Sequence, residues 1–244
     1  MQLLPTVTSD TALFLDFDGT LADLAPAPDA VRIPTGLVPL LQSLHGQLGG
    51  ALAIVTGRTL ADIDHFLAPL RLPAAVEHGA QYRLADGSSP AIDAPDLSPA
   101  EAAMTALAAA HDGLLIERKS RSIALHYRHA PALGPLCHDT LAAVVAEAPD
   151  LELLHGKCVV EAKPAGISKG QAIHVFMAQA PFAGRQPIFV GDDVTDEAAF
   201  AATQQLGGRG IKVGEGATQA LHRCLSPAAL RGWLAAARTT LQHA

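Results

Sequence analysis

The sequence is short of charge, of basic residues and of cysteine, and each shortage excludes a class of protein. Only 17% of its 244 residues are charged while 49% are hydrophobic, which excludes a disordered chain. The net charge of −7 lacks the basic excess that nucleic-acid-binding proteins carry. The three cysteines, Cys137, Cys158 and Cys224, are far apart and odd in number. We therefore interpret them as thiols in a reducing compartment.

Long apolar runs and a basic N-terminal region are also missing. No apolar run approaches the roughly 18 residues that a membrane-spanning helix needs. The best run near the N-terminus is interrupted by Asp16. We therefore expect neither a signal peptide nor a membrane partner, and we predict a cytoplasmic protein. A monomer is the expected state, although no motif in the sequence establishes it.

What the sequence does contain is a repeated alternation of predicted strands and helices. Helical patterns such as Thr35–Leu48 and Leu60–Leu67 separate short apolar runs that do not alternate with polar residues. Such runs are typical of strands buried on both faces of a parallel sheet. The alternation predicts an α/β fold with a doubly wound parallel sheet. The four runs are Ala12–Leu15, Ala51–Val55, Pro187–Val190 and Ile211–Val213.

The middle of the chain has a different pattern. It predicts two antiparallel hairpins, each with one face in contact with water, and two alanine-rich helices. We therefore predict an inserted α+β domain over residues 81–165, and a core made of residues 1–80 and 166–244. The predicted hairpin strands are Leu114–Lys119 with Ser122–Arg128 and Leu151–His155 with Cys158–Lys163, and the helices lie near Pro99–His111 and Leu133–Ala148.

Two carboxylates, Asp16 and Asp18, follow the first predicted strand directly. Charges at the end of a buried strand need a partner, because an unpaired buried charge is costly. A divalent cation in the crevice beyond the strand ends satisfies that need. A solvated acidic turn is the alternative that this segment leaves open.

Three more polar clusters follow core strands or begin a helix. Thr56 and Gly57 offer a hydroxyl and a backbone N–H for phosphate oxygens. Lys169 begins a predicted helix, and the acidic run Gly191–Glu197 follows another apolar run. Each cluster alone has an ordinary explanation, such as a turn, a solvated lysine or acids favoured by a helix dipole. Their joint occurrence at separate strand ends predicts phosphoryl transfer.

Phosphoryl transfer gives each of these groups a task. A phosphate dianion repels a carboxylate nucleophile, so Mg²⁺ bound by Asp16 and Asp192 would neutralise both. Oxygen-only ligation favours this hard ion. Attack by a carboxylate gives an aspartyl-phosphate, while Lys169 spreads the remaining charge. Asp18 could protonate the leaving oxygen and later accept a proton from water.

The four clusters resemble the motifs of the haloacid-dehalogenase (HAD) superfamily of aspartyl-phosphate phosphatases. The resemblance implies that Asp16 is the nucleophile and that Asp18 is the general acid and base. The matching segments are Asp16-Phe17-Asp18-Gly19-Thr20, Thr56-Gly57, Lys169 and Gly191-Asp192-Asp193.

The same resemblance implies the phosphate and metal ligands. Thr56, Gly57 and Lys169 would hold phosphate. Asp192 would complete the Mg²⁺ site with Asp16 and the backbone carbonyl of Asp18. Asp193 and Asp196 are weaker candidates at this site.

The predicted inserted domain presents acids and bases on shared strand faces. Glu117 and Lys119 point the same way, as do Lys157, Glu161 and Lys163, because side chains two apart share a face. Such a surface can bind the hydroxyls of a polyol. A solvated face with cross-strand ion pairs is the open alternative.

These segments resemble the trehalose-6-phosphate phosphatase family. The resemblance extends from Asp16 to about residue 220 and implies trehalose 6-phosphate as the small-molecule substrate. It implies an inserted cap that binds the distal glucose through Glu117, Lys119, Lys157 and Glu161. The matching segments are Glu77-His78-Gly79, Glu117–Lys119, Ala124–Arg128, Gly156–Pro164 and Gly191–Glu197, in which His126 and Arg128 are weaker ligand candidates and His78 is a candidate for the junction of core and cap.

Three other functions compete with this interpretation. The nearest is a cap-bearing phosphatase for sucrose 6-phosphate or a hexose phosphate. A phospho-accepting receiver module is the second, although it does not use the Asp-x-Asp-Gly-Thr arrangement and has no purpose for a polar inserted domain. A catalytically inactive binding protein is the third, and the presence of every expected chemical residue argues against it.

Overall fold

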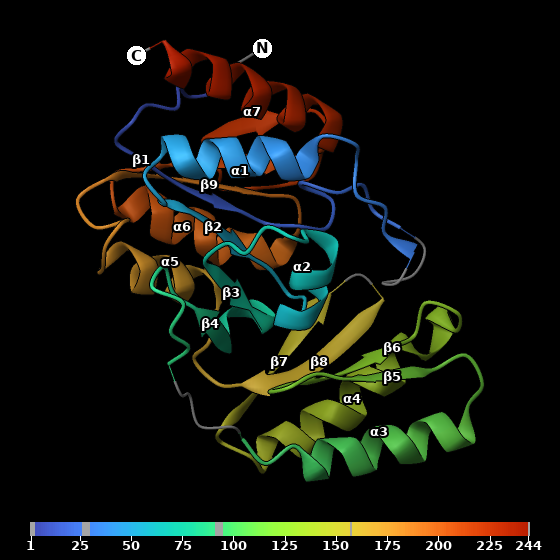
Figure 1. Ribbon diagram of the computed structural model, residues 1–244. Helices are drawn as coiled ribbons and strands as arrows, with labels where there is room; N and C mark the ends of the chain where they lie inside the picture. Colours follow the sequence, from blue (N-terminus) through green and yellow to red (C-terminus); the bar gives the residue numbers. More distant parts are fainter. Residues whose placement is uncertain (1–2, 26–29, 91–94, 157, 244) are drawn as a thin grey trace. The chain divides into compact units, whose positions relative to one another are not determined.

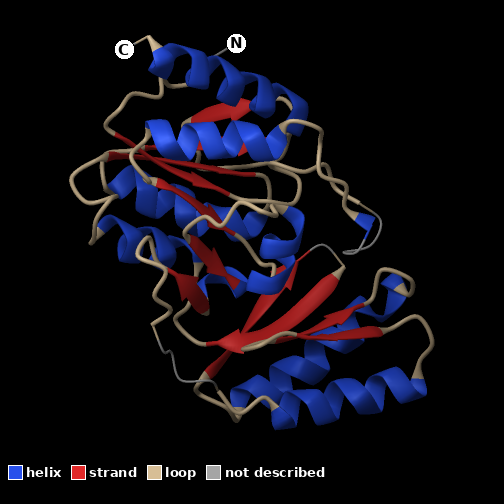
Figure 2. Ribbon diagram, viewed as in Figure 1, coloured by secondary structure: helices blue, strands red, loops and turns tan. Residues whose placement is uncertain are grey.

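A seven-stranded sheet with helices on both faces is the framework of the first of two structural units (Figure 2). The computed structural model describes residues 3–25, 30–90, 95–156 and 158–243. Unit 1 comprises Met1–Pro90 and Ser168–Ala244, and unit 2 comprises Ala91–Ile167. The sheet of unit 1 has the strand order β11-β10-β9-β1-β2-β3-β4. Its strands are β1 (Thr11–Leu15), β2 (Leu52–Val55), β3 (Ala74–Val76), β4 (Gln81–Arg83), β9 (Gln186–Gly191), β10 (Arg209–Val213) and β11 (His222–Cys224).

The four predicted apolar runs are all strands of this sheet. Every residue of β1 and β2 is buried, which explains why neither sequence alternates between apolar and polar residues. All neighbouring strands pair in parallel except β3 and β4. The predicted α/β fold with a parallel sheet is therefore confirmed.

Residues 81–83, which we expected to begin the inserted domain, lie in the core sheet. They form β4, which pairs antiparallel with β3. A tight turn, η2 (Glu77–Gly79), separates the two strands and returns the chain directly along β3. Unit 2 accordingly begins at Ala91.

The order in which successive strands are added to the sheet reverses at β1. From β1 the sheet continues through β2 and β3 on one side and through β9, β10 and β11 on the other. Leu15 at the end of β1 pairs with Val190 in β9. In open α/β sheets, ligands bind in the crevice beyond the carboxyl ends of strands at such a point. The first residues after β1 and β9 therefore lie where a functional site is expected.

Helices cover both faces of the sheet of unit 1 (Figure 1). The pair α1 and α7 lies on one face, and the pair α5 and α6 on the other. In α1 the buried leucines 37, 40, 41 and 44 have the spacing of one helix face, as the sequence pattern predicts. The helices are α1 (Leu37–Gln47), α2 (Leu60–Phe66), α5 (Lys169–Met177), α6 (Glu197–Gln205) and α7 (Pro227–Gln242).

Unit 2 is a four-stranded antiparallel sheet with two helices. The strand order is β5-β6-β8-β7, so the two predicted hairpins are present and join through β6 and β8. Its apolar cluster is built from the helices and from alternate strand residues, including Met104, Leu125, Leu141 and Val160. The elements are α3 (Ser98–Ala110), β5 (Leu115–Arg118), β6 (Ile123–His126), η3 (Pro131–Leu133), α4 (Gly134–Ala146), β7 (Leu151–Gly156) and β8 (Val159–Pro164).

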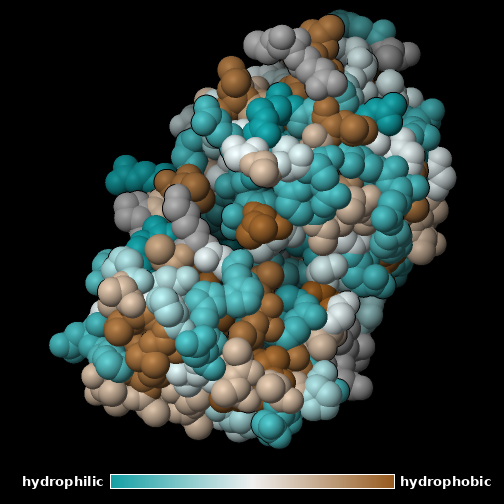
Figure 3. All heavy atoms as spheres, turned by 180° about the vertical axis from the view of Figure 1, so that it is seen from behind, coloured by the Kyte–Doolittle hydropathy of each residue, from teal (hydrophilic) through white to brown (hydrophobic). Residues whose placement is uncertain are grey.

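The surface agrees with the composition. On the face drawn in Figure 3, apolar side chains are interspersed with polar ones. The exposed large apolar side chains belong to separate parts of the chain, among them Leu24, Leu115 and Leu225. Within the described residues, every helix is too short or too polar to cross a bilayer.

We predict opposite effects for two glycine-to-alanine substitutions in helices. A Cβ at Gly170 in α5 would lie 2.5 Å from the carbonyl oxygen of Ala198 in α6, whereas one at Gly46 in α1 would have no neighbour within 4 Å. Gly170→Ala should lower the free energy of unfolding by about 1–3 kcal/mol. Gly46→Ala should raise it by about 0.5–1 kcal/mol. Urea unfolding of both variants checks this, and equal stability of the two would contradict the packing of α5 on α6.

Candidate active site

Asp16 lies directly after β1 and its carboxylate is almost completely buried, at 4% exposure of the residue. Its Oδ1 accepts a hydrogen bond from Nζ of Lys169 at 2.8 Å. Its Oδ2 accepts one from the hydroxyl of Thr20 at 3.3 Å. The Lys169 ammonium also donates to Oδ1 of Asp196 at 2.7 Å. One buried lysine therefore links two buried carboxylates that are far apart in the sequence.

Asp192 follows β9, and charged side chains hold both its backbone N–H and its carbonyl. Oδ2 of Asp196 accepts the backbone N–H groups of Asp192 and Asp193, each at 2.9 Å. The Asp192 carbonyl accepts a hydrogen bond from the ammonium of Lys212, a buried residue in β10. The Thr20 hydroxyl lies 3.3 Å from Oδ1 of Asp192. Side chains of Asp196, Lys212 and Thr20 therefore all contact the turn after β9 and hold it in position.

Gly19 lets the two acidic segments approach each other. Its φ of +73° is in the left-handed region, which favours glycine. A Cβ at this position would lie 2.1 Å from Oδ2 of Asp192. Any side chain here would therefore displace the Asp192 carboxylate.

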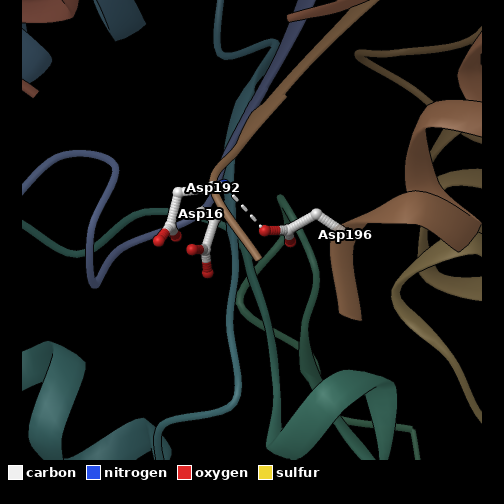
Figure 4. Close-up of side chains that lie close together, drawn as sticks. All are labelled: Asp16, Asp192 and Asp196. Carbon is white, nitrogen blue, oxygen red and sulfur yellow. Dashed lines mark hydrogen bonds between the residues drawn. The ribbon is translucent and has the colours of Figure 1, made fainter. Parts of the chain in front are cut away.

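Carboxylate oxygens of Asp16, Asp192 and Asp196 all lie within 4.8 Å of one another (Figure 4). In Figure 4 the side chains of Asp16 and Asp192 lie next to each other, while Asp196 approaches from the helix that follows β9. Both oxygens of Asp196 already accept hydrogen bonds. An all-oxygen donor set fits Mg²⁺, which is usually bound by one or two carboxylates. The arrangement leaves Asp16 and Asp192 as the two carboxylates best able to hold it.

Burial and neighbouring charges shift the pKa values of Asp16, Asp192 and Lys169. Burial, with Asp196 and Asp192 nearby, raises the pKa of Asp16 well above its usual value, although Lys169 opposes the shift. Burial and Asp196 raise the pKa of Asp192 to about 6. Burial lowers the pKa of Lys169, but Asp16 and Asp196 more than offset this, so that it is raised. The carboxylates therefore favour any additional cation.

The predicted phosphate loop lies after β2 and is pinned by the β3–β4 turn. Thr56 is buried, and its hydroxyl oxygen accepts the backbone N–H of Arg58 at 3.2 Å. The backbone N–H of His78 donates to the carbonyl of Thr56 at 3.0 Å. A Cβ at Gly57 would lie 2.6 Å from the His78 ring. Glycine at position 57 thus allows the imidazole to pack on the loop.

Asp18 is not part of the three-carboxylate cluster. Its carboxylate forms a two-point ion pair with Arg58, with distances of 2.7 Å from Nε and 2.8 Å from Nη2. The sequence alone assigns no role to Arg58, and its place directly after the Thr56-Gly57 turn is the only sequence signal for it.

Unit 2 arranges its polar residues on the sheet face opposite its apolar cluster. Glu117, Ala124 and Glu161 pair across three adjacent strands in one row. Glu161 accepts hydrogen bonds from Lys119 at 2.7 Å and from Ser122 at 2.6 Å. Lys119 and Glu161 are buried, with side-chain exposures of 8% and 5%.

Among the other residues of unit 2 that the sequence singled out, His126 and Lys163 each have a side-chain partner in the structure. His126 contacts Glu117 at 2.7 Å between Nε2 and Oε2, and this hydrogen bond lowers the pKa of Glu117. Lys163 is buried and pairs with Glu152. Lys157 lies outside the described residues. No motif in the sequence identifies Ser122 as a functional candidate, because its contact with Glu161 depends on the register of β6 and β8.

With this geometry established, comparison with known proteins identifies the family. A trehalose-phosphatase family model matches residues 14–222. The chain belongs to the trehalose-phosphatase family. It is 40% identical over 241 residues to the trehalose-6-phosphate phosphatase of Escherichia coli K12, covering 98% of this chain and 91% of that protein. It is 44% identical over 240 residues to the probable trehalose-phosphate phosphatase of Sinorhizobium fredii, covering 97% and 91%.

Solved structures agree with the family assignment. The crystal structure of a trehalose-6-phosphate phosphatase related protein superposes with a TM-score of 0.81 at 28% identity and covers 95% of this chain and 99% of that one. A haloacid dehalogenase-like hydrolase from B. subtilis shares the fold at 14% identity, with a TM-score of 0.66 over 93% of this chain and 99% of that one. The trehalose-phosphatase fold is therefore of the HAD type, as the motifs implied.

We predict that the metal-free protein loses stability as the pH rises through the titration of Asp192. The raised pKa means that the native state binds this proton more tightly than the unfolded state, so the free energy of unfolding falls between about pH 4 and pH 6. Asp192→Asn should therefore stabilise the metal-free protein at pH 7 by about 2 kcal/mol. MgCl₂ should raise the melting temperature of the parent protein but not that of the variant.

Asp193→Asn is the matched control for this experiment. Asp193 is exposed, and its Oδ1 accepts the backbone N–H of Val194, which asparagine can also accept. Its melting temperature should stay within about 2 °C of the parent, which corresponds to about 0.5 kcal/mol. If metal-free Asp192→Asn protein is less stable than the parent at pH 7, the negative charge of the carboxylate cluster is already balanced, which contradicts this prediction.

Proposed function

We propose that this chain hydrolyses trehalose 6-phosphate to trehalose and phosphate, a step of trehalose biosynthesis. The observation that carries the proposal is the buried contact of Asp16 with Lys169, beside Asp192, at the switch point of the sheet. Family membership supports the substrate, because the matching relatives are named for this phosphatase activity.

In the first step, an Asp16 oxygen attacks phosphorus and the bond from phosphorus to the sugar oxygen breaks. Asp18 gives its proton to that oxygen as it leaves. The product is an aspartyl-phosphate. In the second step, water attacks phosphorus, the bond to Asp16 breaks, and Asp18 accepts the proton of the water.

Lys169 and the loop after β2 carry the electrostatic part of the mechanism. Lys169 contacts the nucleophile and can neutralise charge that develops on the phosphoryl oxygens. The Thr56 hydroxyl and the Gly57 backbone are the proposed phosphate donors. Asp16, Asp192 and the Asp18 carbonyl would hold Mg²⁺, which would supply the charge that lets an anionic nucleophile approach a phosphate dianion.

We propose that unit 2, the expected inserted domain, selects the leaving group. Glu117, Lys119 and Glu161, together with Lys157, provide the acceptors and donors that sugar hydroxyls require. The ion pair of Lys119 with Glu161 supports this role, because it holds two buried charged groups in fixed positions on one face. A cytoplasmic monomer is also proposed, and the free state of all three cysteines supports a reducing compartment.

We predict that Asp16→Asn abolishes phosphate release from trehalose 6-phosphate, because the amide cannot form the aspartyl-phosphate. Parent enzyme should release phosphate from trehalose 6-phosphate much faster than from sucrose 6-phosphate or glucose 6-phosphate, and EDTA should stop it. The exposed Asp10, before β1, provides a control, and Asp10→Asn should keep parental activity. Retained turnover in Asp16→Asn would refute the nucleophile, and a preference for sucrose 6-phosphate would refute the substrate.

We predict that Glu161→Gln raises KM for trehalose 6-phosphate by about 10- to 100-fold, the range expected for loss of a charged hydrogen-bond acceptor. Hydrolysis of p-nitrophenyl phosphate, which has no sugar, should change less than about threefold on the same reasoning. Glu152→Gln alters another ion-paired glutamate of the same sheet and should leave both KM values near those of the parent. Equal losses with both substrates would show that Glu161 supports the fold and not sugar recognition.

A further inference from the structure

Arg58 is a largely buried cation to which the two-step chemistry gives no task. Its side chain is 11% exposed, and that of Asp18 is 31% exposed. The guanidinium contacts both carboxylate oxygens, from Nε to Oδ2 at 2.7 Å and from Nη2 to Oδ1 at 2.8 Å. A two-point geometry of this kind orients a carboxylate as well as balancing its charge.

Arg58 is itself held in place from several sides. Its Cζ lies 4.9 Å from the centre of the Phe66 ring. Phe66 stacks on Phe17 at 5.5 Å, and Phe17 is the residue between Asp16 and Asp18. The backbone N–H of Arg58 donates to Thr56 Oγ1, and its carbonyl accepts the N–H of Glu77. The guanidinium is therefore part of the same assembly as the nucleophile strand and the phosphate loop.

This pairing fixes the orientation of the carboxylate on which both proton transfers of the proposed reaction depend. Every guanidinium N–H is a donor, so a carboxylate that accepts two of them is held at both oxygens. In the proposed reaction Asp18 has the acceptor form after it has protonated the leaving sugar and before water attacks.

We propose that Arg58 is a positioning residue for the second step, in which its two contacts hold the Asp18 carboxylate in place to accept the proton of the attacking water. The inference rests on the proposed function. Water oxygen forms a bond to phosphorus, the bond from phosphorus to Asp16 breaks, and its electron pair returns to the Asp16 carboxylate. The water proton moves to Asp18, while Arg58 neither gains nor loses one.

The test uses p-nitrophenyl phosphate, whose leaving group departs without a general acid. In Arg58→Met the first step should remain fast and the second should slow by about 10- to 100-fold, a part of what general base catalysis contributes. Rapid mixing should then show a burst of p-nitrophenolate close to the enzyme concentration. Acid quenching should trap covalent phosphate on the protein.

Two further variants keep the test decisive. Arg58→Lys retains the charge but offers one point of contact, so it should show a smaller burst and an intermediate rate. Arg83→Met is the matched control, because Arg83 is 12% exposed and pairs with Asp64 at 2.7 Å elsewhere in unit 1. It should show no burst and a parental rate.

The proposal is overturned if Arg58→Met and Arg58→Lys slow hydrolysis without a burst and without trapped phosphate. A parental rate in both variants would overturn it equally. Failure of the proposed function has a different signature, since Asp16→Asn would then retain turnover whatever the Arg58 variants do.

Discussion

The buried ammonium of Lys169 is the interaction on which the rest of the site depends. It joins Asp16, which follows β1, to Asp196, which lies after β9. Holding three carboxylates, two of them buried, within 4.8 Å of one another would be very costly without a cation between them. Asp196 in turn accepts the backbone N–H groups that shape the turn containing Asp192. A single lysine therefore couples Asp16, the turn that contains Asp192 and the two central strands.

The incomplete charge balance of this cluster explains how a stable fold can remain ready for catalysis. Burial and the neighbouring carboxylates raise the pKa values of Asp16 and Asp192, and Lys169 only partly offsets this shift. The residual negative charge favours a divalent cation, and the cation then favours a phosphate. Repulsion among the carboxylates thus favours the binding of the two groups that the reaction requires. Arg58 extends the same principle to Asp18, which lies outside the cluster but is paired with a cation of its own.

The sequence could predict whatever depends on local pattern. Non-alternating apolar runs identified β1 and β2, and polar residues directly after strands identified Asp16, Thr56 and Asp192. Asp196 was only a weaker candidate from the sequence and Lys212 was not a candidate, because each acts through a contact between elements that only the folded sheet brings together. The antiparallel β4 was missed for a related reason, since three residues are too few to show a period.

The central claim is that Asp16 carries the phosphoryl group during turnover. The most direct measurement is acid quenching of the enzyme during hydrolysis of trehalose 6-phosphate, followed by borohydride reduction of the acyl phosphate and mass spectrometry of the peptides. The account predicts modification of Asp16 in the presence of Mg²⁺ and none in the presence of EDTA. Modification of another residue, or none under conditions in which the second step is slowed, would contradict it.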